Sequence, residues 1–265
     1  MIGGTGARAG QPRARLELRG VRKRFDDGPG LPVHALDGVD LVAEPGELIA
    51  LIGPSGCGKS TLFQIMAGLE QPTSGEVLID DERRADRLGL CAFMPQRDVL
   101  LPWRRTIDNV TIGLELAGVD RRDARARAEP LLERFGLGEF GRAWPWQLSG
   151  GMRHRAAFLR TVLLGKPAML LDEPFGSLDG ITRSFAQQWL LDVWQEVRST
   201  VCVITHDVSE AVFLADRVYV MSPRPGRISR VLEIDLPRPR ALELQETPAF
   251  AAHVATLRGV LRGQT

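Results

Sequence analysis

Short, unbroken apolar runs recur along this chain, and each is bounded by charged or turn-forming residues. Clear examples lie at 48–52, at 168–173, where the run ends in two acidic residues, and at 200–205. An apolar run of this length is typical of a strand that is buried on both faces of a parallel sheet. Helical segments are expected after these runs, and the alternation predicts an α/β core. The expected helices cover 61–67, 181–198 and 207–215, and further strands are expected at 16–19, 35–42, 76–80, 90–94 and 217–221.

A different pattern covers residues 98–165, where helical periodicity and long charged faces replace the apolar runs. Pro130 lies inside this region and is expected either to begin a new helix or to kink one. We therefore expect a helical subdomain inserted in the α/β core. The chain is divided into a flexible tail at 1–14, a main domain at 15–240, and a C-terminal tail at 241–265 with a last helix at 247–262.

The segment after the first apolar run fits the phosphate-binding pattern G-x-x-x-x-G-K-[ST] at every fixed position. Its glycines let several backbone N–H groups converge on phosphate oxygens, and the following helix adds the positive end of its dipole. Lys59 can reach the β- and γ-phosphates, and the Ser60 hydroxyl can ligate Mg²⁺. A glycine-rich turn without a ligand is the alternative, but the whole context favours a nucleoside triphosphate. The predicted loop consists of Gly53, Pro54, Ser55, Gly56, Cys57, Gly58, Lys59, Ser60 and Thr61.

Composition narrows the function classes. The chain has 265 residues, of which 44% are hydrophobic and 25% charged, as in an ordinary globular protein. Its formal net charge is +1, and without a basic excess nucleic acid is not expected as a partner. No apolar run approaches the roughly 20 residues that span a bilayer. Residues 1–15 lack the apolar centre of a secretory signal.

Three cysteines, Cys57, Cys91 and Cys202, are widely spaced and form no metal-ligand grouping. This usage suits free thiols in a reducing compartment. Cys91 and Cys202 lie in apolar runs and are expected in the core. Cys57 lies within the phosphate loop, where we expect an accidental alkylation site and not a catalyst.

Two acidic residues, Asp172 and Glu173, end an apolar strand downstream of the loop. Doubly wound sheets bind their ligands at the carboxyl ends of the strands. At that edge Asp172 can hold Mg²⁺ through a water molecule, and Glu173 can polarise a water for attack on the γ-phosphate. A strand that merely reaches the surface would carry the same pair, but the upstream phosphate loop favours catalysis.

A second candidate anion site lies far from the first in sequence. Ser149, Gly150 and Gly151 open a helix expected over 152–164, so their backbone N–H groups are available to a phosphate. Two phosphate sites in one chain are most easily explained if two copies face each other. Each ATP would then lie between the phosphate loop of one copy and the Ser-Gly-Gly turn of the other.

With these motifs in this order, the chain resembles the ATP-binding cassette (ABC) ATPases over residues 16–240. The resemblance implies a P-loop NTPase fold with a RecA-like parallel-sheet core, an antiparallel β subdomain and an inserted α-helical subdomain. It also implies hydrolysis of ATP with Mg²⁺. The matching motifs are the Walker A loop at 53–61, Gln96 of the Q-loop, the signature at 148–152, Walker B at 168–173, the D-loop at 177–179 and the switch histidine His206.

The resemblance also assigns roles to single residues. Phe25, which alone would be interpreted as a core residue, would stack on adenine. Gln96 would sense the γ-phosphate, and Asp179 would span the interface between two copies. Met152 and His154 stand where many members have Gln, and because both follow the phosphate-binding turn we expect altered interface packing and not lost activity. The implied catalytic residues are Glu173 as general base, His206 and Lys59, and the implied metal ligands are Ser60, Gln96 and Asp172.

Within the family, the chain resembles ATPases of the nitrate/sulfonate/taurine importer group, for example at 94–98, 172–179 and 235–240. Residues 155–161 and 189–194 are similar to ATPases that serve uptake of thiamine-pyrimidine precursors. The resemblance implies three kinds of partner: a second copy of the chain, integral membrane permease subunits, and a periplasmic or lipid-anchored solute-binding protein. It also implies a peripheral place on the cytoplasmic face of the inner membrane.

The permease would dock on residues 97–110, where Leu100, Leu101 and Trp103 form an apolar cluster rimmed by arginines. Ordinary burial under the helical subdomain explains this cluster equally well. Other functions stay open at this point: a soluble ABC ATPase, an ABC exporter subunit, or a plain P-loop kinase or GTPase in which residues 148–151 would be an idle turn.

Overall fold

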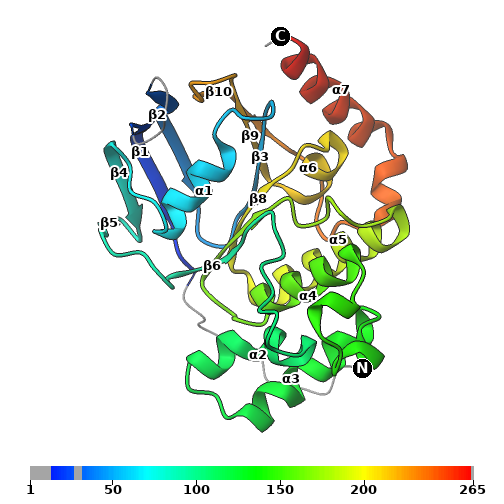
Figure 1. Cartoon of the computed structure of the whole chain (residues 1–265). Helices are drawn as coiled ribbons and strands as arrows, with labels where there is room; N and C mark the ends of the chain where they lie inside the picture. The colour runs from blue at the N-terminus through cyan, green and yellow to red at the C-terminus, as the bar shows by residue number, and fades with distance from the viewer. Residues whose placement is uncertain (1–12, 27–31, 264–265) are drawn as a thin grey trace.

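The computed structural model describes residues 13–26 and 32–263 (Figure 1). The tail predicted at 1–14 therefore lies almost wholly outside the described residues. The described chain folds into two sheets with helices on several sides. Figure 1 shows the antiparallel sheet at the left of the larger sheet and a group of helices at the lower end of the molecule.

The larger sheet has the strand order β10-β9-β3-β8-β7-β6. The pairs from β9 to β6 are all parallel, and β10 runs antiparallel beside β9. All of its parallel strands were expected from apolar runs, whereas β10 falls in a Pro- and Arg-rich segment and was not. The strands are β3 (Leu48–Ile52), β6 (Cys91–Met94), β7 (Ala168–Asp172), β8 (Thr200–Ile204), β9 (Arg217–Met221) and β10 (Ile228–Glu233).

The smaller sheet is antiparallel, with the order β2-β1-β4-β5. Its strands are β1 (Leu16–Phe25), β2 (Val33–Ala43), β4 (Ser74–Ile79) and β5 (Glu82–Arg83). β1 continues through the basic run at 22–24 because that segment still pairs with β2, although with several register shifts. The expectation that β1 ends at residue 19 is therefore wrong.

The central strand β3 separates two hydrophobic clusters. Ile49 and Leu51 face the cluster that contains helix α1 (Lys59–Ala67) and the antiparallel sheet. Leu48 and Ile52 face the other cluster, which contains the helices on the far side of the larger sheet. Because both faces of β3 are covered, its sequence is apolar throughout and does not alternate with polar residues. α1 ends at Gly68, as predicted.

The remaining helices fall into two groups. Those of the first group lie between β6 and β7 in sequence, at the lower end of Figure 1, and we call residues 106–162 the helical region. Pro130 lies inside one continuous helix, so it does not begin a new one. The first group is α2 (Thr106–Leu116), α3 (Arg121–Arg134) and α4 (Gly150–Val162), and the second is α5 (Gly180–Val197), α6 (Val208–Leu214) and α7 (Pro248–Arg262).

Aromatic side chains attach the helical region to the core. The ring of Phe135, just after α3, meets the ring of Trp189 on α5 edge to face, with centroids 4.6 Å apart. Phe158 on α4 meets the same Trp189 ring at 5.7 Å. Such edge-to-face pairs are favoured electrostatically and bury large apolar surfaces. They fix α4, and with it the segment before α4, against the core.

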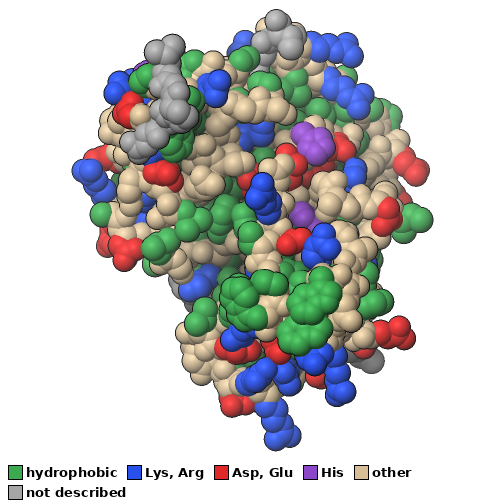
Figure 2. All heavy atoms as spheres, in the orientation of Figure 1, with side chains coloured by type: hydrophobic (Ala, Val, Ile, Leu, Met, Phe, Trp, Pro, Cys, Tyr) green, Lys and Arg blue, Asp and Glu red, His purple; other side chains and the backbone are tan. Residues whose placement is uncertain are grey.

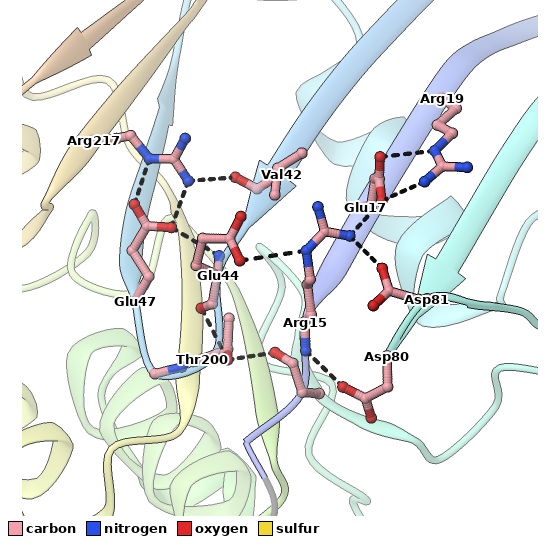
Figure 3. Close-up of polar contacts among 12 residues, drawn as sticks. Arg15, Glu17, Arg19, Val42, Glu44, Glu47, Asp80, Asp81, Thr200 and Arg217 are labelled. Carbon is pink, nitrogen blue, oxygen red and sulfur yellow. Dashed lines mark hydrogen bonds and ion pairs between the residues drawn. The ribbon is translucent and has the colours of Figure 1, made fainter.

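A polar network joins the two sheets (Figure 3). Arg217 on β9 pairs with Glu47 and also donates to the carbonyl oxygen of Val42 on β2, at 3.0 Å. On the antiparallel sheet, Arg15 contacts Glu17, Glu44 and Asp81. Hydrogen bonds from the guanidinium groups of Arg19 and Arg15 lower the pKa of Glu17 to about 2.

Candidate functional site

Four segments meet at the carboxyl edge of the larger sheet. The loop at 53–58 follows β3, Gln96 follows β6, Glu173 follows β7 and His206 follows β8. These strands are neighbours in the order β3-β8-β7-β6, and all run parallel. Their carboxyl ends therefore converge, which is where open α/β sheets bind ligands.

The phosphate loop is held in shape by Lys59. Its ammonium group donates to the carbonyl oxygens of Gly53, at 2.8 Å, and Pro54, at 2.9 Å, and only 9% of the residue is exposed. Gly58 has a φ of 106°, and a Cβ there would lie 2.9 Å from the carbonyl oxygen of Ala35. Glycine is therefore required at this position.

The side chain of Cys57 is buried, and its sulfur accepts a hydrogen bond from the Lys59 ammonium at 3.6 Å. The expectation of an alkylation site is wrong, because the side chain turns into the protein while the backbone forms the loop. Cys91 and Cys202 are in the core as predicted, and burial raises the pKa of the Cys91 thiol to about 11.

Asp172 is 2% exposed at the end of β7. Burial raises the pKa of its carboxyl group, and a hydrogen bond with the Ser60 side chain opposes this rise. Two of the three side chains expected to ligate a metal ion therefore interact, Ser60 from the first turn of α1 and Asp172 from β7. Oxygen donors of this kind are the ligands that Mg²⁺ prefers.

Glu173 occupies a strained backbone position, with a φ of 51°. The Gln96 amide donates to its Oε2 at 3.2 Å, and His206 Nδ1 lies 3.6 Å from its Oε1. Three residues that are far apart in sequence therefore converge on one carboxylate. About a quarter of the Glu173 side chain stays exposed, at 24%, so water can reach it.

A cavity of about 380 Å³ runs from the phosphate loop to Phe25. Phe25 ends β1 and is 37% exposed, and the Lys23 ammonium lies 4.7 Å from its ring centroid. Arg224 also lines this cavity, although its sequence context gave no signal beyond a Pro- and Arg-rich segment. The lining residues are Phe25, Val33, Ala35, Ser55, Gly56, Gly58, Lys59, Ser60, Thr61, Gln96, Glu173, Ile204 and Arg224.

The Ser-Gly-Gly turn and Asp179 do not line this cavity. Ser149 is the N-cap of α4, and its hydroxyl accepts a hydrogen bond from the Met152 N–H at 3.3 Å. Asp179 caps α5 in the same way, accepting from the Thr182 N–H at 3.0 Å. Ser149, Gly150 and Asp179 are all exposed. These two helix starts therefore present backbone N–H groups to the outside of the chain.

Exposed aromatic side chains lie on the helical region and just before it. Trp103 is 71% exposed and Trp146 is 65% exposed, and Trp146 stacks on Trp144 with centroids 5.2 Å apart. Figure 2 shows hydrophobic side chains gathered on the surface of this part of the molecule. Leu100 in contrast is buried, at 8% exposure. Of the predicted docking cluster, Trp103 is therefore available at the surface and Leu100 belongs to the core.

Comparison with known proteins agrees with the arrangement of the phosphate loop, Gln96, Glu173 and His206 described above. The family model described as "ABC transporter" matches residues 36–176. The chain belongs to the ABC transporter family. It is 42% identical to the taurine import ATP-binding protein TauB of Rhizobium johnstonii over 242 residues, covering 88% of this chain and 90% of that one. It is 38% identical to the nitrate import ATP-binding protein NrtD of Synechocystis over 259 residues, covering 94% and 96%.

A solved structure supports the fold. The dimeric, post-hydrolysis structure of the ATP-binding cassette MJ0796 bound to ADP and Pi matches this ABC protein with a TM-score of 0.75 and 30% identity, covering 84% of this chain and all of that one. The predicted α/β cassette fold and the resemblance to the importer group are confirmed. The protein is an ATPase. Among the described residues, no helix has the length and hydropathy to cross a bilayer.

Proposed function

We propose that this ABC ATPase drives uptake of a small solute of the taurine, nitrate or sulfonate type by hydrolysing ATP between two copies of the chain. The relatives named above are import ATP-binding proteins for such solutes. The observation that carries the proposal is that the site is split. One half consists of the phosphate loop and Glu173, which line the cavity, with His206 beside Glu173. The other half, at Ser149 and Gly150, faces away from the chain.

ATP and Mg²⁺ fit the residues that are present. The cavity joins an aromatic side chain, Phe25, to a loop of N–H donors and the Lys59 ammonium, which matches a base at one end and phosphates at the other. Ser60 and Asp172 would hold Mg²⁺ together with Gln96, since they supply hard oxygen ligands. The bound metal would neutralise charge on the phosphates.

Hydrolysis would begin at Glu173. Its carboxylate would accept a proton from the water that attacks the γ-phosphorus, and the bond between that phosphorus and the bridging oxygen of ADP would break. Gln96 and His206 hold the two oxygens of this carboxylate in position. His206, which follows β8 and lies beside Glu173, would then also contact the γ-phosphate.

The second half of each site would come from another copy. The start of α4 offers unpaired N–H groups at Ser149, Gly150 and Gly151 to a phosphate, and Asp179 lies at the start of α5 nearby. A Cβ built on Gly151 would lie 3.6 Å from the carbonyl oxygen of Ser177, so the signature and the D-loop are neighbours. Two head-to-tail copies would enclose two ATP molecules.

Permease subunits would bind beside the helical region, with Trp103 as an exposed anchor. ATP-driven closure of the dimer would move the helical region through Gln96 and pull these subunits, and hydrolysis would reset them. The permease would in turn connect to a periplasmic or lipid-anchored solute-binding protein. The chain would accordingly sit at the cytoplasmic face of the inner membrane.

Two variants test this function. Glu173→Gln keeps the shape of the side chain but removes the base, so it should bind ATP, form a dimer in gel filtration and hydrolyse ATP at least about 100-fold more slowly. Lys59→Ala should lose ATP binding and remain monomeric with ATP. Steady-state hydrolysis by Glu173→Gln at the wild-type rate would contradict the general-base role.

A third variant tests the shared site. Ser149→Glu places a like charge against the partner's phosphates, so in the Glu173→Gln background it should abolish the ATP-dependent dimer while ATP binding persists. A dimer that still forms would contradict the head-to-tail arrangement and place the contact between the two copies elsewhere on the chain. Purification of the chain from membranes with an integral membrane protein supports the transporter; its recovery without one supports a soluble ABC ATPase.

A further inference from the structure

His154 makes a specific contact with the segment that carries Glu173. It lies on the buried side of α4, is 6% exposed, and its Nε2 is 2.8 Å from the carbonyl oxygen of Pro174. A carbonyl oxygen can only accept a hydrogen bond, so Nε2 must carry the hydrogen. His154 is therefore a donor to the residue that directly follows Glu173.

The surroundings of His154 favour this arrangement. Burial lowers the pKa of the imidazole, so the ring is neutral near pH 7. The charged groups that act on the ring are the carboxylates of Asp98 and Glu173, and both oppose this lowering of the pKa. A neutral ring has one N–H, and the hydrogen on Nε2 matches the single carbonyl acceptor at Pro174.

The backbone at Glu173 needs such support. Its φ of 51° is unfavourable for a residue with a side chain, and such a conformation persists where surrounding contacts hold it. The N–H of Glu173 donates to the carbonyl oxygen of Ile204 at 3.0 Å, and the N–H of Gly176 donates to the carbonyl oxygen of Glu173 at 3.2 Å. The hydrogen bond from His154 to the carbonyl oxygen of Pro174 adds a contact from α4 to this segment.

The same helix also holds the segment after Gln96. Arg153 pairs with the Asp98 carboxylate at 3.0 Å. Arg160 donates to the carbonyl oxygen of Asp98 at 3.0 Å and to that of Val99 at 2.9 Å. α4 is therefore bonded to both segments whose side chains meet in the Gln96–Glu173 hydrogen bond.

We propose that His154 is a positioning residue for hydrolysis: its hydrogen bond to Pro174 fixes the Glu173 backbone to α4, the helix whose first turn faces the nucleotide of the partner copy. A shift of α4 on engaging that nucleotide is passed to the carboxylate of Glu173 in the copy's own site. This inference rests on the proposed general-base role of Glu173 and names the residue that places this base.

The test compares two substitutions of His154. His154→Met fills a similar volume without a donor, whereas His154→Gln supplies an N–H. We expect the Met variant to lose about 10- to 100-fold in kcat with an unchanged KM for ATP, because a misplaced base slows the reaction without weakening ATP binding. The Gln variant should recover most of this loss. His253→Met on α7 makes the same substitution at a partly buried histidine away from the site and should leave kcat unchanged.

Equal kcat values in the Met and Gln variants, whether both high or both low, would overturn the positioning role. A Met variant that fails to fold, or whose KM rises in step with the loss of kcat, would overturn it as well and assign His154 to the core. The proposed function is judged separately by Glu173→Gln. If that variant hydrolyses ATP normally, the base is wrongly assigned; if it is inactive while His154→Met is fully active, the positioning inference alone fails.

Discussion

The amide of Gln96 donates a hydrogen bond to Oε2 of Glu173 at 3.2 Å, joining the segments that follow β6 and β7. The other carboxylate oxygen lies 3.6 Å from His206 Nδ1. The carboxylate is thus oriented from both sides by residues of two neighbouring segments. Such orientation before the reaction reduces the cost of bringing a base and a water molecule together.

Replacing Gln96 with Leu removes one of these two contacts. A hydrogen bond to a charged group contributes about 1.5–3 kcal/mol, so we expect kcat to fall by about tenfold or more. Stability should change little, because Gln96 is exposed. Initial-rate measurements together with thermal unfolding check both points. Gln245→Leu, before α7, is a control that should match the wild type, and an unchanged kcat for Gln96→Leu would rule out the orienting role.

Phe25 should contribute to ATP affinity through stacking. Stacking of a base on an aromatic side chain is worth about 1–3 kcal/mol, so Phe25→Ala should weaken ATP binding by about 10-fold or more. Phe140→Ala is a matched control, because Phe140 is also 37% exposed but lies in the helical region. Titration with a fluorescent ATP analogue distinguishes the two variants. Equal affinities would place adenine elsewhere.

Glu210 should make stability depend on pH. Burial raises the pKa of this carboxyl group from 4.5 to about 7, and hydrogen bonds with Thr205 and with the Gln187 amide, at 3.0 Å, oppose the rise. Between pH 4.5 and 7 the folded state holds a proton that the unfolded state has released. The free energy of unfolding therefore falls as pH rises through this window and levels off above it.

The variant Glu210→Gln keeps the hydrogen-bonding shape and cannot ionise. We expect it to be more stable than the wild type above pH 7, by about 3 kcal/mol, and nearly equal near pH 4.5. Denaturant unfolding at several pH values gives the difference between the two proteins, in which other titrating groups cancel. A difference that does not change with pH would show that Glu210 is ionised in the folded state as well.

Gly226 should be sensitive to any side chain. A Cβ there would lie 2.1 Å from the carbonyl oxygen of Cys57 in the phosphate loop. Gly226→Ala should therefore displace this loop, lower stability by about 1–3 kcal/mol and weaken ATP binding. Gly259→Ala is the control, since its Cβ on α7 would meet nothing within 4 Å and should stabilise the helix slightly. Unaltered ATP binding by Gly226→Ala would show that the loop adjusts.

Much of the fold followed from local sequence signals. Apolar runs located β3, β7 and β8 because both faces of these strands are buried, and glycine located the end of α1 at Gly68. β10 and the second half of β1 were not predicted, because charged residues and prolines there mask pairing that depends on a neighbouring strand. The pattern of apolar positions carries no information on such partners.

The site was predictable to the extent that its chemistry lies in contiguous motifs. The phosphate loop and the Asp172–Glu173 pair carry their own signals, whereas the place of Arg224 in the cavity and the contact of His154 with Pro174 arise from tertiary structure. Burial of the Cys57 thiol was missed for the same reason. The direction in which the Cys57 side chain points depends on the backbone conformation of the loop and on the position of Lys59.

Phe25 belongs to the antiparallel sheet, while the loop that ends in Lys59 belongs to the parallel one. An ATP molecule whose adenine contacts the antiparallel sheet and whose phosphates contact the loop after the parallel strand β3 would link the two sheets. ATP binding would then couple the unfolding of the two sheets. Calorimetry should show a single unfolding transition whose midpoint temperature rises with the logarithm of the ATP concentration.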